Sequence, residues 1–139
     1  MAMNKQEIFD KVAEHLLTQR ERAYGTLEDV CYYRIGKNGK TLKCAVGCLI
    51  PDEYYTPSME KAGVADDRVL DILIKADILE DVPENVNFDL LSAGHLLSVL
   101  QTVHDSTPLP WEAELVKVAN KFRLKLPELV IEGEPVIWQ

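Results

Sequence analysis

Three cysteines and one His-Asp pair are the side chains of this sequence with the most reactive chemistry. Cys31, Cys44 and Cys48 follow the spacing C-x12-C-x3-C, and three thiolates with one histidine could hold a tetrahedral zinc ion. Structural zinc sites usually have two short C-x2-4-C knuckles, and this sequence has a single such pair. The alternative is that the thiols are small buried side chains, a common role of free cysteine. We therefore expect neither a metal nor a cofactor.

A hydrolase is a second hypothesis for these residues, with Cys44 or Cys48 as nucleophile or with His104 and Asp105 as the reactive pair. Lys43 and a helix N-terminus at Cys44 would lower the pKa of that thiol. Neighbouring residues on a helix point about 100° apart, however, so we expect that Asp105 does not orient His104. A structural histidine near a helix C-terminus is the alternative. We predict no catalytic residue and keep the hydrolase as the alternative function.

Aromatic and cationic side chains gather on a predicted β-hairpin at about residues 30–44. Its first strand carries Tyr32, Tyr33 and Arg34, and three lysines follow on the turn and the returning strand. Rings and cations together suit a small anionic, nucleotide-like ligand. Alternation along a strand places Tyr33 on the opposite face from Tyr32 and Arg34. An ordinary edge strand protected by lysines against aggregation is the alternative. The predicted ligand-binding residues are Tyr33, Arg34, Lys43, Asp52, Tyr54 and His104.

The net charge excludes several classes of partner. The 139 residues include 23 acidic and 15 basic side chains, for a net charge of −8. This charge repels phosphate backbones and anionic lipids, so we expect neither general nucleic-acid binding nor membrane association. Eight acidic residues between Asp66 and Asp89, against Arg68 and Lys75, give a local charge of −6 that is typical of a solvated helix face. Three cysteines are too few for a disulfide scaffold, which favours a cytoplasmic protein.

The elements that must position these residues begin with a helix. Asn4 and Glu7 form a capping-box pattern, and apolar residues at helical spacing predict a helix from about Lys5 to Ala23, ended by Gly25. The hairpin follows, with an Asn-Gly turn at residues 38–39. Residues 44–50 form a short apolar run that fits a buried strand or one to two helical turns, and we favour a short helix that stops before Pro51. Residues 51–60 are predicted as an ordered, ring-rich loop.

The second half of the sequence is mainly helical. Asp66 or Asp67 is expected to cap a helix that ends near Leu79, and Asn87 to cap a central helix whose apolar stripe includes Leu90 and Leu91. Pro110 suits the first position of a last helix. Residues 125–139 are predicted as two short strands or an extended arm, which could pack on its own core or on a second copy in a homo-oligomer. We predict one α+β domain over residues 1–139, mostly helical, with one β-hairpin beside a helical core.

The pattern C-x-Y-R, K-C-A-x-G-x-L-I-P-D, H-D and W resembles a group of small uncharacterised bacterial and phage proteins. It is carried by Cys31 to Arg34, Lys43 to Asp52, His104-Asp105 and Trp111. The resemblance covers most of the chain up to Leu124. It implies no activity, cofactor or catalytic residue, but it does imply the setting of a phage or prophage accessory gene.

Together these observations predict a small acidic, non-enzymatic binding protein. The resemblance implies a counter-defence factor that binds a host protein or sequesters a small anionic, nucleotide-like signal. The expected binding surface is the hairpin with the loop from Pro51 to Glu60.

Overall fold

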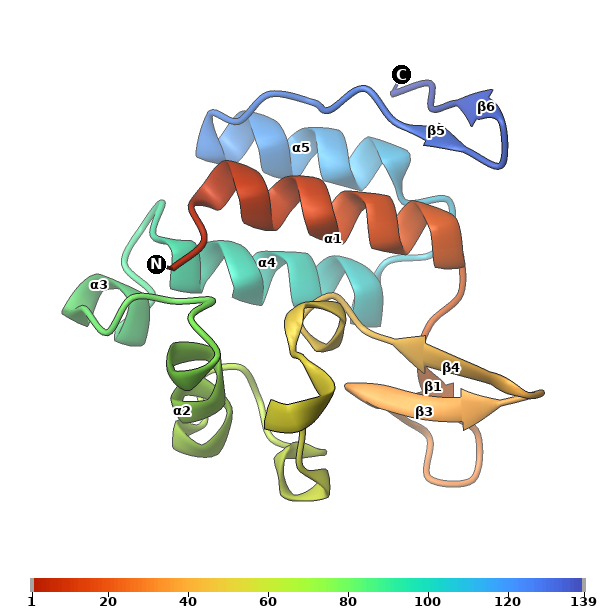
Figure 1. Ribbon diagram of the computed structural model, residues 1–139. Coiled ribbons are helices and arrows are strands. Elements are labelled where there is room, and N and C mark those ends of the chain that lie inside the picture. The colour runs from red at the N-terminus through yellow and green to blue at the C-terminus, as the bar shows by residue number, and fades with distance from the viewer. Residues whose placement is uncertain (1, 139) are drawn as a thin grey trace.

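Three helices form the centre of the fold. The computed structural model describes residues 2–138, and in it α1 (Lys5–Gln19) packs against both α4 (Ala93–Ser106) and α5 (Glu112–Phe122), which also contact each other (Figure 1). Six apolar side chains of α1 are fully buried on one face: Ile8, Phe9, Val12, Ala13, Leu16 and Leu17. The apolar faces of all three helices share one continuous core with the segments around them. The predicted α+β class is confirmed.

The capping box predicted for α1 is present. The Asn4 side chain accepts from the Glu7 N–H at 2.8 Å, and the Glu7 carboxylate accepts from the Asn4 N–H at 2.8 Å. The predicted end of this helix is wrong. It ends four residues before Ala23, because Arg20 adopts the left-handed conformation with φ 52° and its N–H bonds to the Leu16 carbonyl. The chain then turns toward the hairpin without using Gly25.

Within residues 2–138, three two-stranded antiparallel sheets flank the helices, and the pairing of β1 with β2 is the one that was not predicted. Strand β3 (Arg34–Lys37) pairs with β4 (Lys40–Lys43), and Asn38 and Gly39 both have positive φ, as the Asn-Gly turn requires. This hairpin is shorter than predicted, because Val30 and Cys31 form β2 and pair instead with β1 (Tyr24–Gly25). The loop between β1 and β2 therefore lies beside the hairpin.

Two predicted helix starts in the second half differ from the structure. Asp66 caps α2 (Asp67–Lys75) as predicted, although α2 ends before Leu79. A short helix α3 (Pro83–Val86) follows, and α4 is capped by Ser92 rather than Asn87. Leu90, predicted to be part of its apolar stripe, is 78% exposed. Similarly, α5 begins at Glu112, two residues after Pro110.

Three 3₁₀ turns connect the hairpin to α2. They are η1 (Gly47–Leu49), η2 (Asp52–Tyr54) and η3 (Pro57–Met59). The first of these is the short helix predicted before Pro51. No helix among residues 2–138 is long and apolar enough to span a membrane.

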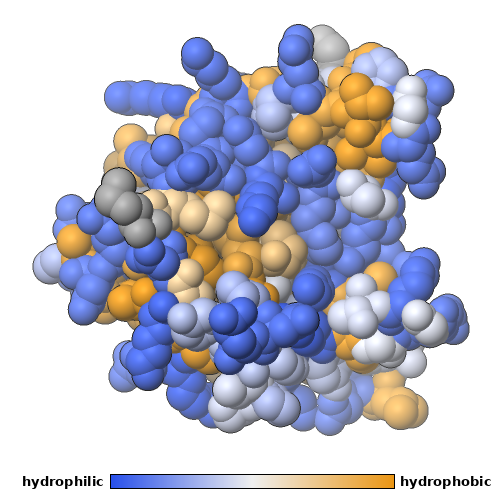
Figure 2. All heavy atoms as spheres, in the orientation of Figure 1, coloured by the Kyte–Doolittle hydropathy of each residue, from blue (hydrophilic) through white to orange (hydrophobic). Residues whose placement is uncertain are grey.

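The C-terminal segment packs on its own chain. Val130–Ile131 (β5) and Glu134–Pro135 (β6) form the two short strands that were predicted, and Val136 and Trp138 contact the core. The indole N–H of Trp138 donates to the Pro127 carbonyl at 2.9 Å. Val130 and Ile137 are exposed. Figure 2 shows hydrophobic surface at the upper right, where Figure 1 places β5 and β6.

Candidate functional site

The hairpin distributes its predicted binding residues over different environments. Tyr33 points into the core and is 5% exposed. Its hydroxyl donates to the Ala62 carbonyl at 2.6 Å, and burial raises its pKa. Tyr33, which was predicted to bind a ligand, thus has its ring buried in the core just before β3 begins.

Arg34 is the first residue of β3, and partners within the protein hold its guanidinium. It donates to Asp52 Oδ1 at 2.8 Å and to the Ile50 carbonyl at 3.1 Å. It also lies over the ring of Tyr55, 4.2 Å from the centroid. The ion pair with Arg34, followed by the charge of Lys43, lowers the pKa of Asp52. The structure thus brings Arg34, Lys43 and Asp52 together.

Two residues that sequence reasoning did not select complete this cluster. The Glu60 carboxylate accepts from the backbone N–H groups of Tyr33 at 2.8 Å and Arg34 at 3.2 Å. It also accepts from the Tyr55 hydroxyl at 2.6 Å. Burial, followed by the hydrogen bond to Glu60, raises the pKa of Tyr55 to about 12. One sequence feature points to Tyr55 and Glu60: both lie in the ring-rich loop that follows the strand carrying Arg34.

Lys43 and Tyr54 have different roles. The Lys43 backbone ties the hairpin to α1, because its N–H donates to Gln19 Oε1 at 2.9 Å and its carbonyl accepts from His15 Nε2 at 2.8 Å. Tyr54, at the end of η2, is 36% exposed. Of the six predicted ligand-binding residues, Arg34, Lys43, Asp52 and Tyr54 are thus at least partly accessible. Tyr33 and His104 are buried.

A groove opens on the side of the hairpin that faces the β1–β2 loop. It has a volume of about 420 Å³, and we call it the hairpin groove. Its main lining residues are Tyr24, Leu27, Glu28, Tyr32, Ile35 and Lys37. Leu27 is fully exposed at the tip of the loop. Tyr32 was predicted on the hairpin, but Tyr24 and Leu27 join the groove only because β1 pairs with β2, and no pattern in the sequence predicts that pairing.

His104 forms a hydrogen-bonded pair with its neighbour Asp105, contrary to the expectation from helix geometry. The two Cα atoms are only about 3.8 Å apart, so the side chains can swing together although they start about 100° apart on the helix. The Nδ1···Oδ1 distance is 2.6 Å. On the other side of the ring, Nε2 accepts from the Ala23 N–H at 3.0 Å. The ring is completely buried and packs on Trp111 at 5.7 Å between centroids.

Cys31 lies next to this pair, but His104 cannot act as a base that activates its thiol. Its sulfur and the polar atoms of His104 and Asp105 lie within 4.8 Å of one another. Because Ala23 occupies the Nε2 lone pair, the proton of the neutral ring must sit on Nδ1 and point to Asp105. No position remains on the ring to accept a proton from the thiol. Burial, followed by the charge of Asp105, raises the Cys31 pKa to about 11.

The same bonding pattern opposes metal binding at this cluster. A metal ion on Nδ1 would require a proton on Nε2, and that proton would face the Ala23 N–H. Within residues 2–138, this is the sole group of three such ligand types close enough to share an ion, so the three cysteines do not form the zinc site that was considered. Burial raises the pKa of Cys44, and it raises that of Cys48 to about 12, which is contrary to the activation by Lys43 that was considered.

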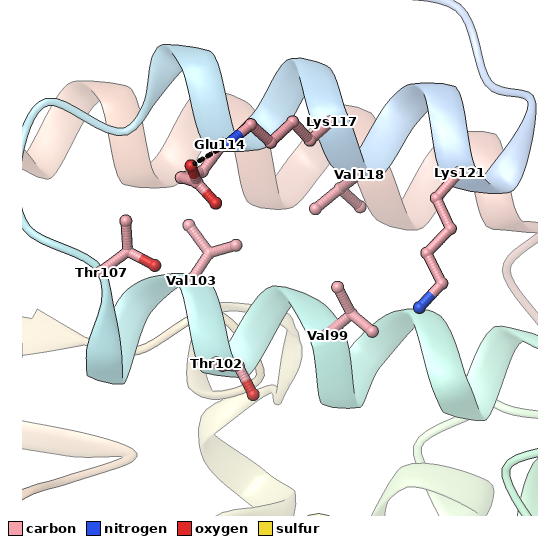
Figure 3. A pocket seen from close by; sticks show the side chains of 8 residues that line it. All are labelled: Val99, Thr102, Val103, Thr107, Glu114, Lys117, Val118 and Lys121. Carbon is pink, nitrogen blue, oxygen red and sulfur yellow. Dashed lines mark hydrogen bonds and ion pairs between the residues drawn. The ribbon is translucent and has the colours of Figure 1, made fainter.

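Helices α4 and α5 line a smaller groove, drawn in Figure 3. Val99, Val103 and Val118 form its apolar floor, and its volume is about 270 Å³. At one side Lys117 pairs with Glu114 at 2.9 Å. None of the predicted binding residues lines this groove.

Comparisons with known protein families, curated proteins and solved structures found no match to this chain. The resemblance to small bacterial and phage proteins therefore stays a prediction.

Proposed function

We propose that this protein is a non-enzymatic binding protein whose hairpin groove docks a segment of a partner polypeptide. The observation that carries the proposal is the full exposure of Leu27 beside the rings of Tyr24 and Tyr32. Transfer of one exposed leucine side chain from water into an interface is favourable by roughly 1.5–3 kcal/mol. Tyrosines beside such an anchor are typical of interface centres.

The backbone around the groove supports a polypeptide partner over a small ligand. The β1–β2 and β3–β4 sheets have two strands each, so every strand has an edge without a partner strand in its own sheet. An extended segment could add to such an edge by main-chain hydrogen bonds while its side chains enter the groove. In the setting implied by the phage-like sequence pattern, that segment belongs to a host protein.

Photo-crosslinking tests this function. A benzophenone amino acid placed at Leu27 should capture a discrete host protein from bacterial lysate. In a pull-down without the crosslinker, wild type should retain that protein and Leu27→Ser should not. The matched control is Leu90→Ser, since Leu90 is also an exposed leucine but lies outside the groove. Equal recovery of the partner by wild type and Leu27→Ser would contradict the proposal.

A small anion at the Arg34–Asp52 pair is the second candidate function. The observation that favours it is the 87% exposure of the Asp52 side chain, which a phosphate group could displace from the Arg34 guanidinium. Isothermal titration with AMP and with inorganic phosphate tests it. Asp52→Asn should strengthen binding, because the competing carboxylate is lost, and Arg34→Ala should abolish it. Absence of heat for both probes on wild type and Asp52→Asn would exclude this candidate.

A further inference from the structure

A third groove lies between α2 and α3. Figure 1 shows these two helices at the lower left, away from the β3–β4 hairpin at the right. Its volume is about 530 Å³, and we call it the acidic groove. It is lined by Asp67, Arg68, Leu70, Asp71, Ile74, Asp81 and Val86. It shares no residue with the hairpin groove, so the inference does not depend on the proposed function.

The floor of the acidic groove is apolar and partly open to water. Val86 is 41% exposed and Ile74 is half-buried, whereas Leu70 belongs to the core beneath them. Exposure of aliphatic side chains in a concave surface is unfavourable and is relieved when another apolar side chain fills the groove. The occupant must therefore present an apolar face of its own.

The charges at the rim of the acidic groove indicate the charge of that occupant. Both cations of the acidic segment already pair with carboxylates, Arg68 with Asp66 at 3.0 Å and Lys75 with Asp71 at 2.9 Å. Asp67 and Asp81 have no ion-pair partner in the part of the chain that the structure describes. Of the three carboxylates that line the groove, Asp67 and Asp81 therefore leave their negative charge open to a partner. Such a rim attracts cations and repels nucleic acids.

We propose that the acidic groove docks a basic amphipathic helix of a partner protein. Leucine-like side chains of that helix fill the groove over Val86 and Ile74, while lysine or arginine side chains on its flanks reach Asp67 and Asp81. This is the helix-in-groove mode of recognition, in which apolar anchors supply affinity and the surrounding charges supply orientation and rate.

A fluorescent peptide probe tests the proposal on the full-length protein. The probe is a 14-residue helix-forming peptide of Lys, Leu and Ala with leucines on one face, and its anisotropy is measured at low and high salt. We expect saturable binding that Asp67→Asn with Asp81→Asn weakens about tenfold, as expected for loss of two interfacial charges. Val86→Ser should weaken binding by a factor that does not depend on salt.

Two controls separate docking from general attraction to an acidic protein. Glu128→Gln with Glu134→Gln makes the same change of net charge at exposed positions outside the groove and should leave binding within about twofold of wild type. A second peptide, with serine in place of each leucine, should bind far more weakly. Equal weakening by both double variants, or equal binding of both peptides, would overturn the proposal. Circular dichroism confirms that each variant is folded.

Discussion

Replacement of His104 by alanine separates a structural histidine from a catalytic one. In the structural interpretation, the ring accepts from the buried Ala23 N–H, donates to Asp105 and packs against Trp111. His104→Ala removes all three interactions at once. In the alternative hydrolase, the same variant would lose turnover and keep its stability.

The expected loss of stability follows from these contacts. An orphaned buried N–H group costs about 1–3 kcal/mol, and loss of a hydrogen bond to a charged group costs about 1.5–3 kcal/mol. The second value belongs near its lower limit, because 35% of the Asp105 side chain is exposed. Together with the space left beside Trp111, we expect a loss of about 3–5 kcal/mol. For a chain of this length that corresponds to a decrease in Tm of about 10–17 °C.

Urea unfolding followed by circular dichroism measures this change at pH 7. The matched control is His95→Ala, on the same helix but partly exposed and without a bond to a buried backbone group. It should cost less than about 1 kcal/mol. His104→Gln, whose amide oxygen can reach toward the Ala23 N–H, should recover part of the loss. A destabilisation by His104→Ala no larger than that of His95→Ala would refute the reasoning.

Three further predictions concern packing, pH and thiol reactivity. Gly94→Ala should destabilise the protein by about 2 kcal/mol or more, because the new Cβ would lie 2.1 Å from the Asn85 carbonyl oxygen. Gly63→Ala is the control: its Cβ would have no atom within 4 Å, so the free energy of unfolding should change by less than about 1 kcal/mol. Urea unfolding of both variants measures these changes. Burial lowers the pKa of His15 below 6.5, so the unfolded chain binds the proton more readily than the folded protein. The contribution of His15 to stability is therefore full above pH 6.5 and is lost as the pH falls. The free energy of unfolding should differ less between pH 7.5 and pH 5.5 in His15→Gln than in wild type. The raised pKa values of Cys31 and Cys48 predict slow reaction with iodoacetamide at pH 7.5 in the native protein and much faster reaction in urea. Mass spectrometry measures the labelling. Rapid labelling of either thiol in the native protein would contradict the partly buried positions of Cys31 beside Asp105 and of Cys48 in η1.

Local patterns in the sequence determined several elements correctly. The Asn4–Glu7 capping box, the Asn38-Gly39 turn and the Asp66 cap are each satisfied within a few residues. The α+β class also follows from local periodicity, because an apolar face at helical spacing must pack on something. These features depend on interactions between near neighbours in the chain, and a single sequence displays them directly.

Only the tertiary structure decided which residues meet. The pairing of β1 with β2 placed Leu27 beside the hairpin, and the bond from Ala23 to His104 joins residues that are 81 positions apart. The Glu60 carboxylate likewise reaches back to Tyr33 and Tyr55 to organise the Arg34 cluster. Such partners are selected by packing of the whole core, and no spacing in the sequence records them. Local sequence patterns therefore predict the helices and the turn, whereas the environment of each candidate functional residue depends on the folded state.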